Sequence, residues 1–192
     1  MGSRAIYRQR EKIMILITAF EPFGGSSINT SAEVLRLLPD SIAGHSVRKL
    51  LLPVVFGKAA ETALQCHADY IFLLGEAGGR NTVTPERKAR NLRDARIPDN
   101  EGKQPQKETI LPNGPAEYCT ALPLEEIVAV MRDDSIEISE DAGAFVCNDT
   151  FYLVGTGSSM PVEFIHVPAV PDQAEKYAEI LKRFMELAVT VC

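Results

Sequence analysis

The sequence lacks the features that mark membrane proteins and nucleic-acid-binding proteins. It contains no run of about eighteen consecutive apolar residues, the length that a membrane-spanning helix requires. It also has no excess of positive charge, because its formal net charge at pH 7 is −6. A nucleic-acid-binding surface needs clustered lysine and arginine side chains. We therefore expect neither a membrane span nor a nucleic-acid partner.

Patterns that hold metals or nucleotides are absent as well. The four cysteines, at positions 66, 119, 147 and 192, show no CxxC spacing and have no histidine at ligand spacing. The glycine-rich stretch Gly75–Gly79 has neither the Walker spacing nor a full GxGxxG pattern. We expect no metal, no organic cofactor and no disulfide scaffold.

The apolar run at 13–20 follows basic residues, as the core of a signal peptide does, but no small-residue cleavage site comes after it. We therefore expect a buried first strand and a cytoplasmic protein with reduced thiols. The polar, basic residues 1–12 predict a flexible N-terminal extension. With 192 residues and 45% apolar residues in the chain, the segment 13–192 is long enough for one domain with a substantial core.

Hydrophobic patterns predict strands that alternate with helices. Continuous apolar runs predict strands buried on both faces, and further strands are expected at shorter apolar segments. The expected strands are 13–20, 47–55, 69–74, 136–139 and 162–167. Helices are expected after a capping box at 30–33, over 57–67, from Pro123 onward, after Cys147 as far as the glycines at 155–157, and over 171–191. This alternation predicts an α/β protein whose twisted, mainly parallel sheet carries helices on both faces.

In such folds, functional residues gather in the loops that follow the carboxyl ends of the strands. Four stretches occupy such places: 20–25, 76–80, the segment around Cys147, and His166. The polar, irregular segment from about 80 to 115 is long for a compact domain, which is typical of a functional or disordered loop.

Cys147 stands at the beginning of an expected helix, where backbone amides and the helix dipole lower the pKa of a thiol. A thiol peptidase also needs an imidazole base and a group that orients it. Of the three histidines, only His166 lies at a strand end that could face Cys147.

Spacing does not select the third group among the acidic residues 86, 94, 99 and 101 of the long loop. A cysteine in an apolar run is more often a core residue, and a histidine at a strand end is more often structural. The residues by themselves lead to an α/β domain for which a Cys/His hydrolase is one interpretation.

Six motifs, which follow one another along the chain, are typical of one protein family. They are Thr18–Gly25, Gly75–Arg80, Thr84–Arg87, Asp94–Asn100, Gly143–Asn148 and Phe164–Pro168. Together they make about residues 13 to 185 resemble the pyroglutamyl-peptidase I family, also called pyrrolidone-carboxylate peptidases. The resemblance implies a three-layer α/β/α sandwich with a mixed, mainly parallel sheet. It also implies a cytosolic cysteine peptidase, commonly a homotetramer, that removes an N-terminal 5-oxoproline (pyroglutamate) from peptides through a thioester.

The same resemblance implies roles for individual residues. The catalytic residues would be Cys147 as nucleophile, His166 as base and Glu86 as third member, with Arg96 near the oxyanion. The wall of the substrate pocket would be formed by Phe20, Phe23, Phe145 and the adjacent Val146. An apolar wall suits a lactam ring, because an ordinary N-terminus would have to bury an unpaired ammonium there.

Two features depart from the family pattern. Glu76 stands where the family often has a glutamine that binds the lactam; a carboxylate can still accept the ring N–H, and we expect Arg80 to compensate its charge. Cys147 and His166 are only 19 positions apart. One alternative follows from these departures: a homologue that binds pyroglutamyl groups without turnover. A second alternative is a nucleoside phosphorylase of related fold that uses 75–80 for phosphate.

Overall fold

Two apolar runs of the sequence form the centre of the main β-sheet. In the computed structural model, which describes residues 13–191, strand β1 (Met14–Phe20) pairs in parallel with β4 (Tyr70–Ala77). Apart from the first residue of each strand and the last two residues of β4, all of their residues are buried, as expected for strands that are covered on both faces. The predicted buried first strand is confirmed.

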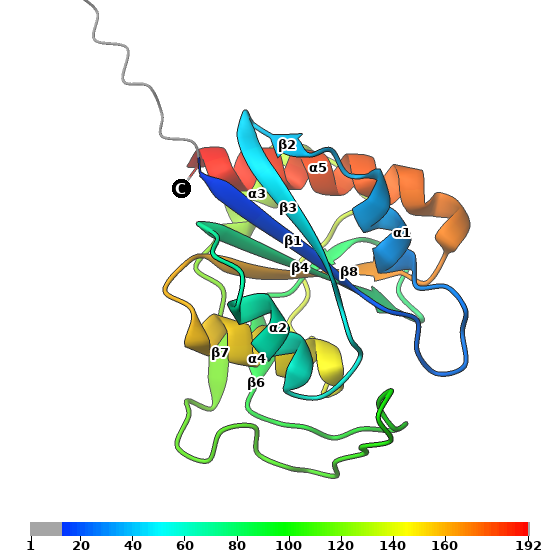
Figure 1. The fold of residues 1–192 in the computed structure, drawn as a ribbon. Coiled ribbons are helices and arrows are strands. Elements are labelled where there is room, and N and C mark those ends of the chain that lie inside the picture. Colours follow the sequence, from blue (N-terminus) through cyan, green and yellow to red (C-terminus); the bar gives the residue numbers. More distant parts are fainter. Residues whose placement is uncertain (1–12, 192) are drawn as a thin grey trace, which may run out of the picture.

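The main sheet has six strands in the order β2-β3-β1-β4-β8-β5 (Figure 1). The four central strands are parallel, and the short strands at both edges are antiparallel to their neighbours, so the sheet is mixed and mainly parallel, as predicted. The remaining strands of this sheet are β2 (Ser41–Ile42), β3 (His45–Leu52), β5 (Thr84–Pro85) and β8 (Val162–Pro168). A separate two-stranded sheet consists of β6 (Lys88–Arg90) and β7 (Glu117–Cys119).

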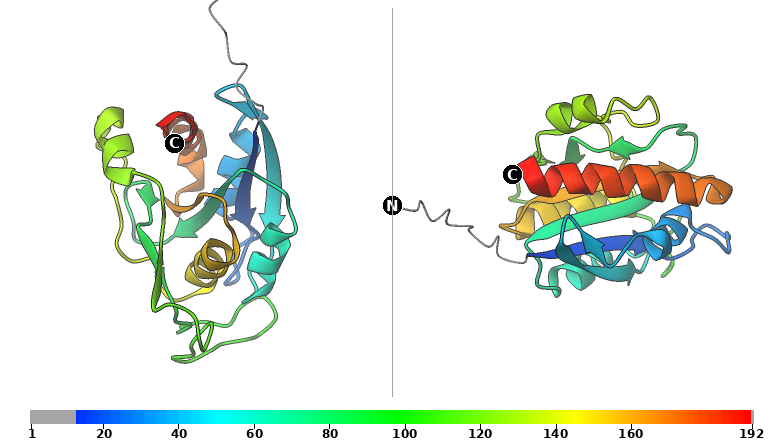
Figure 2. Two further views of the ribbon diagram at one scale, coloured as in Figure 1. Left: turned by 90° about the vertical axis from the view of Figure 1, so that its left-hand side faces the viewer. Right: turned by 90° about the horizontal axis from the view of Figure 1, so that it is seen from above.

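Helices cover both faces of the main sheet and complete three layers (Figures 1 and 2). One face packs against α1 (Thr30–Leu37), α3 (Leu124–Met131) and α5 (Ala174–Val191), the last preceded by a 3₁₀ turn at Pro171–Gln173. The other face packs against α2 (Lys58–Leu64) and α4 (Val146–Gly157). Each face therefore has its own hydrophobic core, and the three-layer α/β/α expectation is confirmed.

Two local predictions were wrong. Residues 136–139 form only isolated bridges, at Ile136 and Ser139, instead of a strand. The expected capping box of α1 is replaced by Asn29, whose side-chain oxygen accepts a hydrogen bond from the Ser31 amide at 3.0 Å. Helix α4 ends at Gly157, within the glycine-containing stretch where its end was predicted.

The long segment between β6 and β7 is irregular, as predicted (Figure 1). Hydrogen bonds attach its beginning to the first turn of α4. The buried Asn148 side chain accepts a hydrogen bond from the Arg90 amide at 2.8 Å and donates to the carbonyls of Arg90 and Leu92 at 2.9 Å. The side-chain amide of Asn148 thus provides hydrogen-bond partners for three backbone groups that would otherwise lack one. The predicted extension at 1–12 lies outside the described residues. Within residues 13–191, no helix has the length and apolarity needed to cross a bilayer.

Gly155 marks a close contact in α4 and gives a stability prediction. A Cβ atom at this position would lie 2.3–2.5 Å from ring atoms of Tyr118, which packs edge-on against Phe151. We expect Gly155→Ala to lower the free energy of unfolding by about 1–2 kcal/mol, because the steric cost exceeds the gain in helix propensity. In the matched control Gly157→Ala, the new Cβ meets only the flexible end of Leu64, at 3.3 Å. Thermal unfolding measures both; equal melting temperatures for the two variants would contradict the prediction.

A second stability prediction concerns Glu163 of β8, which is fully buried. Burial raises the pKa of its carboxyl well above the ordinary 4.5. The hydroxyl of the nearby Thr120 donates its hydrogen bond to the Val162 carbonyl. The folded protein therefore holds this proton more tightly than the unfolded chain. The resulting stabilisation is complete below pH 4.5 and is lost as the pH rises toward the raised pKa.

We expect Glu163→Gln, which cannot ionise, to gain melting temperature relative to the unmodified protein as the pH is raised from 4.5 to 8. Thermal melts across that range test this, with the same substitution at the exposed Glu126 as control. A difference between Glu163→Gln and the unmodified protein that stays constant with pH would show that the buried carboxyl is not linked to folding.

Candidate active site

Cys147 is the second residue of helix α4 and faces the carboxyl end of the main sheet. The N-cap position of this helix is Phe145, whose side chain cannot accept a hydrogen bond. The first backbone amides of a helix have no intrahelical acceptor. Around Cys147 these donors are therefore left without a side-chain cap, which suits the binding of a negatively charged oxygen.

Gly75 provides the space into which the thiol projects. It pairs with His166 across β4 and β8, so both residues lie on the sheet face that packs against α4. A Cβ at position 75 would lie 3.0 Å from Cys147 Sγ and 2.7 Å from Cζ of Phe164. The Phe164 ring in turn lies 4.8 Å from the His166 ring, centroid to centroid. The thiol and the imidazole thus converge around a residue that has no side chain.

Glu86 orients the imidazole of His166 through a hydrogen bond to its Nδ1 atom. Its carboxylate Oε1 lies 2.6 Å from His166 Nδ1, and the Glu86 side chain is fully buried. The Glu86 amide also donates to the Phe164 carbonyl at 2.8 Å, which fixes the backbone next to the same strand. Within residues 13–191, His166 Nε2 has no hydrogen-bond partner, so this nitrogen is available to a thiol or a substrate.

Arg80 binds the same carboxylate. Its Nη1 lies 2.7 Å from Glu86 Oε1, and its Nη2 donates to the Asp141 carbonyl at 2.9 Å. The expectation that Arg80 compensates Glu76 was therefore wrong. Arg80 follows the end of β4 and turns toward Glu86, whereas Glu76 points to the start of helix α1.

The expected lowering of the Cys147 pKa is also wrong for the ligand-free protein. Burial raises the pKa of this thiol to about 12, and the negative charges of Glu86 and Glu76 act in the same direction. Arg80 and the backbone at the start of the helix lower the pKa, but by less than burial raises it. The resting thiol is therefore protonated at neutral pH.

An aromatic pocket lies beside the thiol. The lining includes five of the six predicted substrate-binding residues, together with Cys147, and two that were not predicted, Asn29 and Val54. The predicted ones are Phe20, Phe23, Glu76, Phe145 and Val146. The centroid of the Phe145 ring lies 5.9 Å from that of Phe23 and 5.4 Å from that of Phe56, and the Phe56 contact is edge-on. The position of Asn29 could have been found from the sequence, because an asparagine immediately before a helical pattern predicts an N-cap. No sequence pattern distinguishes Val54.

Glu76 enters this pocket from the end of β4. Its Oε2 accepts a hydrogen bond from the Thr30 amide at 2.6 Å, at the N-terminus of α1. Within the described residues, Oε1 has no hydrogen-bond or ion-pair partner. The helix N-terminus therefore offsets part of the negative charge, a task that we had expected of Arg80.

Arg96, the sixth predicted substrate-binding residue, is exposed and makes no hydrogen bond or ion pair in the described part of the chain. A different arginine reaches helix α4. Arg93 Nε lies 2.6 Å from Oδ1 of the buried Asp149, whose Oδ2 accepts from the Gly57 amide at 2.7 Å. Arg93 therefore holds the first turn of α4, although no sequence motif distinguished it.

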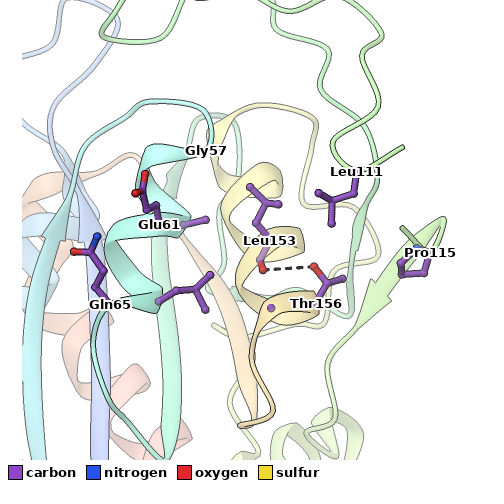
Figure 3. Close-up of a pocket in the computed structure, with 10 residues that line it drawn as sticks. Gly57, Glu61, Gln65, Leu111, Pro115, Leu153 and Thr156 are labelled. Carbon is purple, nitrogen blue, oxygen red and sulfur yellow. Dashed lines mark hydrogen bonds between the residues drawn. The ribbon is translucent and has the colours of Figure 1, made fainter. Parts of the chain in front are cut away.

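A larger groove lies elsewhere, between α2, α4 and the segment near Leu111 and Pro115 (Figure 3). Its empty volume is about 1260 Å³, against about 230 Å³ for the aromatic pocket. The only titratable side chain in its lining is Glu61, and there is no cysteine or histidine. The chemistry is therefore assigned to the smaller pocket. Across residues 13–191, no group of histidine, cysteine, aspartate and glutamate side chains is arranged to hold a metal ion.

Comparisons with known proteins agree with this geometry. A family model described as pyroglutamyl peptidase matches residues 13–190. A pyrrolidone-carboxylate peptidase of Gloeobacter violaceus is 45% identical over 92% of this chain and 91% of its own length. A Levilactobacillus brevis protein of the same name is 42% identical over 83% of each chain.

Solved structures give the same result. The crystal structure of pyroglutamyl peptidase I from Bacillus amyloliquefaciens superimposes with a TM-score of 0.85, at 36% identity, over 93% of this chain and 98% of that chain. A mutant pyrrolidone carboxyl peptidase from Pyrococcus furiosus gives a TM-score of 0.84 at 34% identity, over 93% and 99%.

The position of Arg80 predicts the reactivity of the thiol. Because its positive charge lowers the pKa of Cys147, we expect Arg80→Met to slow alkylation of Cys147 by iodoacetamide at pH 9 by about threefold to tenfold, through a smaller thiolate fraction. Peptide mass spectrometry measures the rate at each cysteine separately. The control is Arg36→Met, because Arg36 is exposed and pairs with Glu33 on α1. An unchanged rate at Cys147 in Arg80→Met would refute the electrostatic role.

Proposed function

The chain belongs to the pyroglutamyl peptidase family, and we propose on that basis that it hydrolyses the bond after an N-terminal pyroglutamyl residue of peptides, with Cys147 as the nucleophile. The observation that carries the proposal is the convergence of Cys147, His166 and the buried Glu86 beside an aromatic pocket. Thiol chemistry on an amide needs a nucleophile, a base and a group that orients the base.

In the proposed first step, His166 Nε2 takes the proton of Cys147, and Sγ attacks the carbonyl carbon of the pyroglutamyl residue. Because burial raises the pKa of the thiol, Cys147 needs this base to become a nucleophile. Backbone amides at the uncapped start of α4 then stabilise the negatively charged oxygen of the tetrahedral intermediate.

In the following steps, the imidazolium donates its proton to the leaving amine, and the C–N bond breaks to leave a thioester on Cys147. His166 next activates a water molecule that hydrolyses the thioester and releases pyroglutamate. Glu86 fixes the orientation of the ring through Nδ1 and stabilises the imidazolium. Arg80 holds Glu86 in place.

The pocket supports the substrate assignment. A lactam ring is neutral and flat, and it can pack against the side chains of Phe20, Phe23 and Phe145 without burying a charge. Its N–H is a suitable donor for the free Oε1 of Glu76. Arg96 remains a proposed contributor near the oxyanion, although it makes no contact in the ligand-free protein.

Neither alternative gains support. A homologue that binds without turnover would not need the Glu86–His166 hydrogen bond, which is present at 2.6 Å. A phosphorylase would use the 75–80 loop for phosphate, but the arginine of that loop is already paired with Glu86.

We further propose that residues 13–192 form one catalytic domain, that the protein assembles as a homotetramer, and that it works in the cytoplasm. The family resemblance supports the tetramer. A reducing compartment is consistent with a thiol nucleophile and with the free state of Cys66, Cys119 and Cys147.

The test is release of a fluorescent amine from a pyroglutamyl amide. We expect Cys147→Ser to reduce kcat/KM by at least about a thousandfold, because the hydroxyl is a much weaker nucleophile in this site. Cys66→Ser, which changes a cysteine that does not line the pocket, is the control and should retain activity. The corresponding glutaminyl amide, with an open chain and a free ammonium, should not be cleaved. Full activity of Cys147→Ser would exclude the proposed nucleophile.

A further inference from the structure

The carboxylate of Glu76 makes the pocket more negative than a neutral substrate requires. One oxygen accepts from the Thr30 amide, and the other has no partner within residues 13–191. No arginine, lysine or histidine of the described chain pairs with it, since Arg80 binds Glu86. The N-terminus of α1 offsets only about half an elementary charge. The pocket therefore retains a capacity for a positively charged group.

The aromatic side chains around Glu76 favour the same kind of ligand. Phe20, Phe23 and Phe145 line the pocket with Glu76. The faces of aromatic rings carry negative electrostatic potential and attract cations. An organic cation with an apolar ring would therefore interact favourably with both the carboxylate and the phenylalanines.

The N-terminal residue that combines these properties is proline. Its five-membered ring has the size of the pyroglutamyl ring and carries the scissile carbonyl on the carbon next to the nitrogen. It lacks the ring carbonyl, and its nitrogen is protonated near neutral pH, as N-terminal amines are. The two N–H groups of this ammonium would give Glu76 a charge-assisted hydrogen bond, which is stronger than one from a neutral lactam N–H.

We propose that this pocket also accepts an N-terminal proline, so that the protein releases proline from prolyl peptides in addition to pyroglutamate from pyroglutamyl peptides. This rests on the proposed peptidase activity, because the same thiol performs the reaction. Cys147 Sγ attacks the prolyl carbonyl carbon, the bond to the leaving amine breaks as that amine takes a proton from His166, and water hydrolyses the thioester to free proline and the thiol. No oxidant, reductant or other reactant is consumed.

The experiment compares prolyl, pyroglutamyl and alanyl amides of one fluorescent amine, with the unmodified protein and the variants Cys147→Ser, Glu76→Gln and Glu33→Gln. We expect the unmodified protein to cleave the prolyl amide, and Cys147→Ser to abolish this. The alanyl amide, whose ammonium has no ring to pack against the phenylalanines, should react at least tenfold more slowly than the prolyl amide.

Glu76→Gln removes the charge but keeps the size of the side chain. We expect it to lower the ratio of kcat/KM for the prolyl amide to that for the pyroglutamyl amide by at least tenfold. Glu33→Gln, on the exposed side of α1, should leave the ratio unchanged. As a measurement that does not require cleavage of the prolyl amide, pyrrolidinium should inhibit pyroglutamyl hydrolysis competitively in the unmodified protein and at least tenfold more weakly in Glu76→Gln.

The outcomes separate the two proposals. Cleavage of the pyroglutamyl amide without Cys147-dependent cleavage of the prolyl amide overturns the proline inference alone. A prolyl-to-pyroglutamyl ratio that Glu76→Gln does not change also overturns it. Cleavage of the prolyl amide without cleavage of the pyroglutamyl amide would overturn the proposed function and the dual specificity, and would support only the acceptance of proline by the pocket. Absence of both activities in the folded protein overturns both.

Discussion

The site depends on one buried carboxylate. Glu86 has no exposed surface, and its Oε1 binds the His166 ring and the Arg80 guanidinium at once. Burial of an isolated carboxylate is expensive, and a positively charged partner is what makes it tolerable. Arg80 therefore has to stay beside Glu86, which ties the loop after β4 to the segment after β5. The imidazole, the thiol and the pocket are arranged around this pair.

Local patterns predicted the elements that carry the site, but not the contacts between them. The continuous apolar runs at 13–20 and 69–74 were sufficient to predict the central strands, because full burial leaves a signature in neighbouring residues. The Glu86–His166 contact joins residues 80 positions apart. Spacing therefore left four acidic residues open, and only the family resemblance selected Glu86.

The errors have physical reasons of the same kind. Residues 136–139 were predicted as a strand from their local pattern, yet they form only isolated bridges, because strand formation depends on partners elsewhere in the chain. The partner of Arg80 was expected nearby in sequence at Glu76, but Glu76 is bound by the start of α1. The thiol pKa was predicted from the helix alone, and burial, which depends on the whole fold, has the larger effect.

The protonated resting state of Cys147 affects how long the protein lasts as well as how it reacts. Oxidation to sulfenic acid and its irreversible successors requires thiolate character and exposure. Burial of Cys147 reduces both in the ligand-free protein, because it raises the pKa of the thiol and limits its exposure. The burial that raises the pKa of the nucleophile is therefore expected to slow its reaction with peroxide and with stray electrophiles as well.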